Sequence, residues 1–222
     1  MPHQPPQPPP GLRERKRIET RQRIADTASL LFMTRGFEAV TVAEIAAAAD
    51  VSKVTVFNYF PRKEDMFFDR QPEAQAMLTA AVEDRAPGRT PLAAIGELML
   101  DLVDTAHPLA GVGPGYQIFM NTVRSSPTLR ARAREALDEL EDALTELFTA
   151  AGGPLAGPGP APPGAADARV AAGLLVGAAR AVYRTMVRRQ LAGEPPAALA
   201  APYRAALQDA LSRVERAVAG GT

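Results

Sequence analysis

Residues 41–63 read TVAEIAAAADVSKVTVFNYFPRK, a stretch that predicts two short helices joined by a tight turn and ended by a proline. Thr41 and Glu44 match the T-x-x-E capping box that starts a helix. Ser52 is a good N-cap for the second helix, which begins only about three residues after the first one ends. Two helices this short and this close cannot run side by side, so we expect them to cross steeply as a helix-turn-helix unit.

The second helix, from Lys53 to about residue 60, carries the side chains best suited to contacting DNA. Lys53 and Thr55 stand in its first turn, which enters a major groove first, and Val54 is small enough to approach a thymine methyl group. Val56 and Phe60 are four residues apart, and we interpret them as the inward face that holds this helix in place.

Phe57, Tyr59 and Lys63 leave two interpretations open. The Tyr59 hydroxyl can donate a hydrogen bond to a phosphate oxygen, and Lys63, just past Pro61, can pair with a second phosphate. Phe57 and Tyr59 also fit an ordinary core, and Lys63 fits an ordinary solvated surface. From the residues alone, the structural interpretation of each is the more economical one.

Composition favours an all-α protein. Hydrophobic residues make up 46% of the 222 residues and aromatic residues only 5%, with long runs of Ala, Leu and Arg. The chain has no cysteine, which excludes disulfides, thiolate metal sites and cysteine nucleophiles. Net charge is zero, but residues 12–63 hold ten basic and six acidic residues, which leaves 15 basic and 19 acidic elsewhere. A basic N-terminal quarter fits contact with nucleic acid at one end, and equally a solvated basic helix surface.

Helical periodicity and breaker residues divide the remainder of the chain. Residues 1–11 are proline-rich and predict a tail without a fold of its own. Residues 152–164 read GGPLAGPGPAPPG and predict a flexible loop. We expect a first helix that begins between Leu12 and Lys16 and ends at Gly36, followed after the two short helices by helices over residues 64–86, 91–106, 116–125, 128–151, 165–192 and 196–219.

Residues 24–68 resemble the N-terminal DNA-binding domain of the TetR family of transcriptional regulators. The resemblance rests on A-x-x-L-F-x-x-x-G-F at 28–37, T-V-x-E-I-A at 41–46, V-S-x-x-T-x-F-x-Y-F at 51–60 and P-x-K-E at 61–64. Two residues depart from the family pattern. Asp50 stands where the turn usually has glycine, and Asp tolerates the left-handed region better than most residues. Tyr59 replaces a frequent histidine but keeps a hydrogen-bond donor.

The resemblance implies a division of the chain into a DNA-binding domain over residues 12–63 and a helical ligand-binding and dimerisation domain over 64–222. It implies a homodimer that binds double-stranded DNA at a palindromic operator and is released as a repressor by a small-molecule effector. The residues alone leave a packed monomer as an equal competitor. The DNA-contacting residues it implies are Thr41, Ser52, Lys53, Val54, Thr55, Phe57, Tyr59 and Lys63, with Thr41 and Lys63 on phosphates.

The helices that line the effector cavity in relatives suggest a set of pocket residues, largely apolar with a few polar groups. Each of these residue types is more often part of a plain core than of a pocket. Two alternatives to a ligand-released repressor also stay open, a helical interaction module and an activator that uses the same DNA-binding head. The suggested pocket residues are Met99, Leu102, Val103, Tyr116, Phe119, Met120, Asn121, Arg124, Tyr183 and Met186.

The sequence gives no sign of catalysis, a cofactor or a metal site. His107 beside Pro108 is more simply a helix-end residue than a general base, and no glycine-rich phosphate loop or paired ligand motif is present. The most apolar run, residues 170–179, is too short to cross a bilayer, and no apolar signal segment opens the chain. We therefore expect a cytoplasmic protein that is not an enzyme and has no membrane partner.

Overall fold

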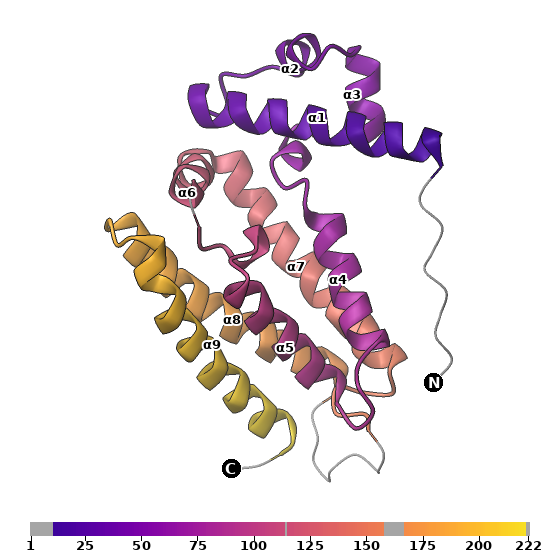
Figure 1. Cartoon of the computed structure of the whole chain (residues 1–222), viewed down its shortest axis with the longest axis vertical. Helices are drawn as coiled ribbons and strands as arrows, with labels where there is room; N and C mark the ends of the chain where they lie inside the picture. The colour runs from indigo at the N-terminus through magenta and orange to yellow at the C-terminus, as the bar shows by residue number, and fades with distance from the viewer. Residues whose placement is uncertain (1–10, 114, 158–166, 221–222) are drawn as a thin grey trace. The chain divides into compact units, whose positions relative to one another are not determined.

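The fold of the protein is helical throughout the residues described by a computed structural model, which are 11–113, 115–157 and 167–220. Nine α-helices and two short 3₁₀-helices account for most of this part of the chain (Figure 1). In chain order they are α1 (Leu12–Arg35), α2 (Val42–Ala48), α3 (Lys53–Tyr59), η1 (Glu64–Met66), α4 (Gln71–Glu83), α5 (Pro91–Asp104), η2 (Pro108–Ala110), α6 (Tyr116–Ser125), α7 (Pro127–Ala150), α8 (Ala168–Leu191) and α9 (Pro196–Val218).

The all-α fold class predicted from the sequence is confirmed. The predicted tail over residues 1–11 lies outside the described residues except for Gly11, and the predicted loop over 152–164 lies outside them from residue 158 onward. The helix expected over 64–86 is wrong as a single element, because η1 and α4 are separate. Pro72 explains the break. It has no backbone N–H to donate and is accommodated in the first turn of α4. In a continuous helix over residues 64–86 it would stand in the middle of the helix, where that N–H is needed.

Two compact units divide the chain, with the boundary between Asp69 and Arg70. The sequence interpretation put the division after residue 63. Contacts extend the first unit because Met66 and Phe67 are buried and the Phe67 ring meets the Phe32 ring edge-on, with ring centroids 5.8 Å apart. Residues up to Asp69 are called the N-terminal unit below, and those from Arg70 the C-terminal unit.

The N-terminal unit forms around α1. Ile24, Ala28 and Phe32 recur at helical spacing on one face of α1 and are buried there. Ile45 of α2 and Val56 of α3 are likewise buried in this unit. Each short helix therefore contributes one large aliphatic side chain to a core that neither could bury alone.

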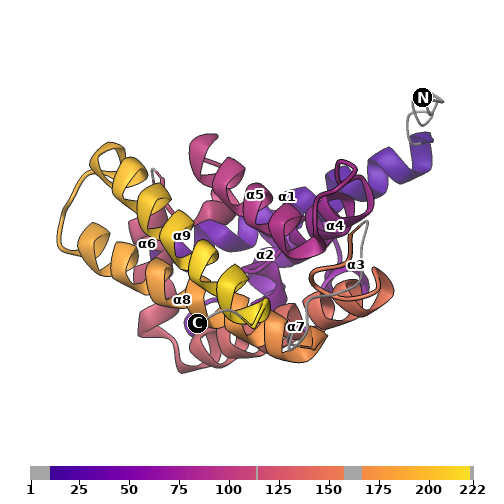
Figure 2. The same ribbon diagram turned by 90° about the horizontal axis from the view of Figure 1, so that it is seen from below.

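The C-terminal unit is a set of packed helices in which α8 lies against both α7 and α9, and α5 lies against α4 and α9 (Figure 2). Its core includes Ile95, Phe148, Leu175 and Leu207, from four different helices. Because α8 has neighbours on two sides, its buried residues occupy more than one stripe, as its nearly continuous apolar sequence predicts.

Helix α8 also has the length and composition of a membrane span. It is the one such helix in the described part of the chain, with a mean hydropathy of 1.3 over its most apolar window. The sequence estimate considered only residues 170–179, whereas the helix has 24 residues. This resemblance is weak evidence for a membrane, because the core helix of a globular domain passes the same test.

Candidate nucleic-acid interface

Helix α2 begins at the capping box that the sequence predicts. The Thr41 hydroxyl oxygen accepts a hydrogen bond from the Glu44 backbone N–H at 3.2 Å. In return the Glu44 carboxylate accepts from the Thr41 backbone N–H and hydroxyl, both at 2.8 Å. The hydrogen bond from Arg35, at 2.6 Å, together with those from Thr41, lowers the pKa of Glu44 to about 2. The carboxylate is therefore charged at neutral pH and ties α1 to the start of α2.

The turn between α2 and α3 is tight and uses the left-handed region, as predicted. Asp50 has a φ of 52°, and the Val51 backbone N–H donates to the Ala46 carbonyl at 2.9 Å. Ser52 then caps α3, since its hydroxyl oxygen accepts from the Thr55 backbone N–H at 3.0 Å. The Ser52 and Thr55 hydroxyls also share a hydrogen bond of 2.8 Å, so both are occupied within the turn.

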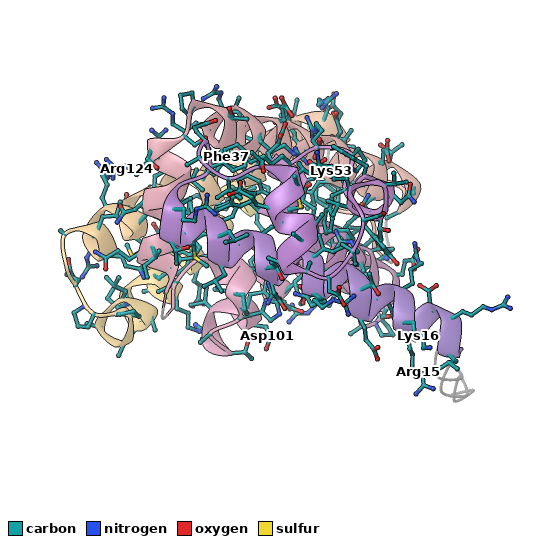
Figure 3. The ribbon with its side chains drawn as sticks, turned by 90° about the horizontal axis from the view of Figure 1, so that it is seen from above. Arg15, Lys16, Phe37, Lys53, Asp101 and Arg124 are labelled. Atoms are coloured by element: carbon teal, nitrogen blue, oxygen red, sulfur yellow. The ribbon has the colours of Figure 1, made fainter. Side chains whose placement is uncertain are left out.

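Helix α3 separates its inward and outward side chains as the sequence predicts. Val56 and Phe60 are fully buried. Val54 is 69% exposed and Phe57 is 51% exposed, although both are hydrophobic. Lys53, at the first position of α3, is exposed and has no ion pair in the described part of the chain (Figure 3). The outer face of α3 therefore combines apolar groups with an unpaired positive charge.

Tyr59 and Lys63 occupy intermediate positions. The Tyr59 side chain is half-buried. The Lys63 ammonium donates to the Phe37 carbonyl at 2.5 Å and lies 4.0 Å from the centroid of the Phe37 ring. Burial lowers the pKa of Lys63 below its usual value. In this structure the lysine therefore fastens the segment after α3 to the loop after α1, a contact that its position in the sequence does not indicate.

The basic residues of α1 divide into two groups. Arg21 donates to the Asp69 carbonyl at 3.1 Å and lies over the Phe60 ring, and Arg23 donates to the Ala49 carbonyl at the end of α2 at 3.1 Å. Sequence analysis missed these roles, because a cluster of arginines does not reveal which members face the protein. Arg15 and Lys16 are exposed near the N-terminal end of α1, without an ion pair among the described residues (Figure 3).

Four of the predicted pocket residues come together where α6 meets α8. The Tyr116 and Phe119 rings stack with centroids 5.4 Å apart, and the Tyr183 ring meets Tyr116 edge-on at 6.2 Å. The Tyr116 and Tyr183 hydroxyls are hydrogen-bonded to each other, and the Tyr183 hydroxyl lies 3.2 Å from the Met120 sulfur. Burial raises the pKa of Tyr183. These four residues are called the α6–α8 cluster below.

Gly111 explains how Tyr183 fits into this cluster. A Cβ atom at this position would clash with Cε2 of the Tyr183 ring, and Gly111 has a φ of 72°. Both the close approach and the left-handed backbone require glycine here.

The other six predicted pocket residues are not gathered into one site. Met99, Leu102, Val103 and Met186 belong to the core of the C-terminal unit or pack against it. Asn121 and Arg124 are exposed on α6.

Two hollows of the C-terminal unit lie elsewhere. A shallow one of about 470 Å³ follows α4 from Pro72 to Asp84. A smaller one of about 240 Å³ lies between Gly113 and the junction of α8 with α9. It is lined by Gln190, whose buried side-chain oxygen has no hydrogen-bond partner among the described residues. None of the ten predicted pocket residues lines either hollow. Among the described residues, no group of three or more His, Cys, Asp or Glu side chains is placed to hold a metal ion.

Comparison with known proteins finds a family model that matches the N-terminal unit. Residues 24–69 match the family model described as bacterial regulatory proteins, tetR family. The chain therefore carries a domain similar to the DNA-binding domain of the TetR family over these residues. The match begins in α1, includes α2, the turn and α3, and ends at the last residue of the N-terminal unit.

The chain is also similar to two curated proteins. The chain is 31% identical over 144 residues to the HTH-type transcriptional regulator TcmR of Streptomyces glaucescens, a match that covers 64% of each protein. It is 28% identical over 128 residues to the nucleoid occlusion factor SlmA of Pasteurella multocida, covering 55% of this chain and 62% of that protein. The chain therefore covers less than two thirds of either relative.

Solved structures extend the likeness to both units. The structure of the SmeT–triclosan complex is 17% identical, with a TM-score of 0.57, and the match covers 90% of this chain and 91% of that one. NalD from Pseudomonas aeruginosa is 18% identical, with a TM-score of 0.53, and the match covers 87% of this chain and 97% of that one. At these identities the likeness establishes that the fold is shared.

Proposed function

We propose that this protein is a cytoplasmic transcriptional repressor of the TetR family that binds a palindromic operator as a homodimer and is released by a small molecule. The observation that carries the proposal is the outer face of α3. Val54 and Phe57 remain exposed there beside the unpaired Lys53, although a hydrophobic side chain gains nothing from water. A major groove supplies what this face lacks, namely thymine methyl groups for the apolar side chains and acceptor atoms for the lysine.

In this proposal α3 contacts the bases, and residues before and after α3 contact the phosphates. Lys53, Val54 and Phe57 are exposed, and Lys53 has no ion pair among the described residues, so all three are free to meet base edges. Thr41 and Lys63 are proposed to contact phosphates. Lys63 would then exchange the Phe37 carbonyl for a phosphate oxygen, which replaces a neutral acceptor by a charged one.

The proposed dimer contact is the outer face of α8. Val170 is 49% exposed and Leu174 is 39% exposed. Gly177 and Ala181 continue the same stripe at helical spacing and are exposed as well. An apolar stripe that ends in small residues allows a second helix to approach closely, and pairing it with its own copy around a two-fold axis would bury it. Such a dimer implies half-sites related by a dyad, roughly 34 to 36 Å or a multiple of that distance apart.

Release by an effector is proposed at the C-terminal unit. NalD is described as the secondary repressor of a multidrug efflux pump, and SmeT forms a complex with triclosan. The α6–α8 cluster offers the mixture that a small organic molecule needs, with three aromatic rings, a thioether and two hydroxyls that bond to each other. A ligand that binds this unit more tightly in a form with low operator affinity would release the DNA, by as much as the two affinities differ.

Selection of bound fragments from genomic DNA, followed by footprinting, tests the DNA-binding proposal. We expect a protected, dyad-symmetric site that outcompetes unrelated DNA. Lys53→Ala should relax base preference, whereas Tyr59→Phe should weaken binding to all sequences alike. Arg216→Ala, which removes an exposed positive charge from α9, is the matched control and should change neither. If the protein binds DNA of any sequence weakly and added salt abolishes this binding, the result would instead support a helical interaction module.

A reporter gene behind the selected site separates the two regulatory directions. Deleting the protein should raise expression if it is a repressor and lower expression if it is an activator. Either result leaves the DNA-binding proposal intact, because the same α3 face serves both directions.

A further inference from the structure

Arg132 on α7 is a buried charge in the C-terminal unit. Its side chain is only 5% exposed, although arginine is among the residues that are rarely buried. The guanidinium donates to both oxygens of the Glu139 carboxylate at 3.1 Å. Glu135 lies at 3.9 Å as a second, more distant acid. Burial of a guanidinium requires such partners, because an unpaired one would be strongly destabilising.

The partner that distinguishes this cluster is Gln71. The Arg132 guanidinium donates to the Gln71 side-chain oxygen, and the Gln71 amide donates to Glu139 at 2.6 Å. The three side chains therefore form a closed ring of hydrogen bonds, in which each contacts the other two. Gln71, Arg132 and Glu139 are called the latch below.

The position of Gln71 gives the latch its consequence. Gln71 is the first residue of α4 and follows Asp69, the last residue of the N-terminal unit, by two positions. Helix α4 lies beside α7 in the C-terminal unit (Figure 1). The latch thus holds the point where the chain enters the C-terminal unit.

The latch favours one position of the first turn of α4. If the first turn of α4 moves away from α7, the Arg132 guanidinium stays buried and loses one of its acceptors. A hydrogen-bond network that includes a buried charge is costly when partly satisfied, so displacement of Gln71 from Arg132 is disfavoured. The latch therefore favours the position in which the first turn of α4 is fixed to α7.

We propose that the latch residues are positioning residues for operator binding, which they support without touching DNA. This inference rests on the proposed function, because it requires a dimer that engages two half-sites. When one N-terminal unit is bound, the second binds its half-site as an intramolecular event, with an effective concentration set by how the connection is held. A fixed first turn of α4 limits the positions that the chain between the N-terminal unit and α4 can adopt. Release of the latch widens this range of positions and so lowers the effective concentration at the second half-site.

The test compares a full dyad operator with a single half-site of the same sequence. Gln71→Ala removes the neutral member of the latch and leaves the Arg132 ion pair with Glu139 in place, so the fold should persist. We expect at least tenfold weaker binding to the dyad and less than twofold change on the half-site. Glu139→Gln should act in the same direction. Arg134→Ala, an exposed arginine on the same helix, is the matched control and should leave both affinities unchanged.

A measurement without DNA checks the structural half of the proposal. The Ala74 backbone N–H donates to the Arg70 carbonyl at 3.0 Å in the first turn of α4. Hydrogen exchange at this amide should accelerate in Gln71→Ala and remain unchanged in Arg134→Ala. Unchanged exchange in Gln71→Ala would overturn the latch as the element that fixes this turn.

The outcomes distinguish failure of the latch proposal from failure of the proposed function. If the wild-type protein binds the dyad tightly and Gln71→Ala binds it equally well, the latch proposal is overturned and the proposed function stands. If Gln71→Ala loses affinity for the dyad and the half-site by the same factor, the latch acts on something other than two-site binding and the proposal is again overturned. If the wild-type protein prefers no DNA sequence, the proposed function is wrong and the latch proposal falls with it.

Discussion

Hydrophobic side chains are exposed on the α3 surface, whereas those of the α6–α8 cluster pack against one another. Val54 and Phe57 lie exposed on a helix whose inner side is already filled by Val56 and Phe60. Tyr183 instead packs against Tyr116, and their hydroxyls bond to each other. An exposed apolar group needs an external partner to explain it, whereas a packed one is explained by folding alone. The exposed face of α3 therefore indicates a binding function more directly than the packed α6–α8 cluster does.

The largest expected effect is a loss of stability in the N-terminal unit alone. Phe32 is fully buried, and its ring contacts Phe37 and Phe67. Phe32→Ala should cost about 3–5 kcal/mol, enough to unfold a small unit and abolish operator binding. Calorimetry should then show the loss of the N-terminal transition while the helices of the C-terminal unit persist. Loss of the whole helical signal in one transition would mean that the two units do not unfold separately.

Tyr203 provides a pH test of the C-terminal unit. Burial raises the pKa of Tyr203 to about 12, against about 10 in an unfolded chain. Its folded pKa is raised, so its contribution is complete below pH 10 and is lost as pH rises towards 12. That contribution amounts to about 2–3 kcal/mol at most. Denaturant unfolding across this range should show the decline, and Tyr203→Phe should reduce it. An unchanged decline in the variant would exclude Tyr203 as its source.

How much the sequence could predict differs between the units for physical reasons. Thr41, Ser52 and Asp50 act through neighbours three or four residues away, so local rules placed both short helices and their turn correctly. Helix α3 could also be divided into inner and outer faces by periodicity alone. The helix expected over residues 64–86 runs through Pro72, a residue that fits the first turn of a helix and not its interior.

Contacts between distant residues could not be predicted. Lys63 reaches the carbonyl of Phe37, and Arg132 reaches Gln71, 61 positions away in the sequence. Neither spacing follows a helical or strand period, and each depends on how helices pack after they form. For the same reason the proposed pocket residues could be assigned to helices, but not to one cavity.

Phe57 tests the outer face of α3 directly. Phe57→Ala should weaken operator binding by about 1–3 kcal/mol, or roughly fivefold to 150-fold, if the ring contacts bases or sugar in the groove. Thermal stability should change little, because half of the side chain is already in water. Leu30→Ala is the matched control, since Leu30 is an exposed hydrophobic residue on α1 outside the proposed interface. Equal losses in the two variants would argue that exposed apolar residues contribute to binding without regard to position.

The smallest effect is expected at Thr41, where capping and DNA contact can be distinguished. Thr41→Ala removes the hydroxyl that accepts from the Glu44 N–H and should cost about 1 kcal/mol of stability. Thr34→Ala is the control, because the Thr34 hydroxyl bonds to carbonyls of its own helix and caps nothing.

Thr41→Ser keeps the capping oxygen and should restore the melting temperature. If Thr41→Ser also restores operator affinity, the hydroxyl accounts for both roles of the residue. If stability returns while affinity stays low, the threonine methyl group contacts the DNA. A loss of stability in Thr34→Ala as large as that in Thr41→Ala would show that the capping box does not account for the effect.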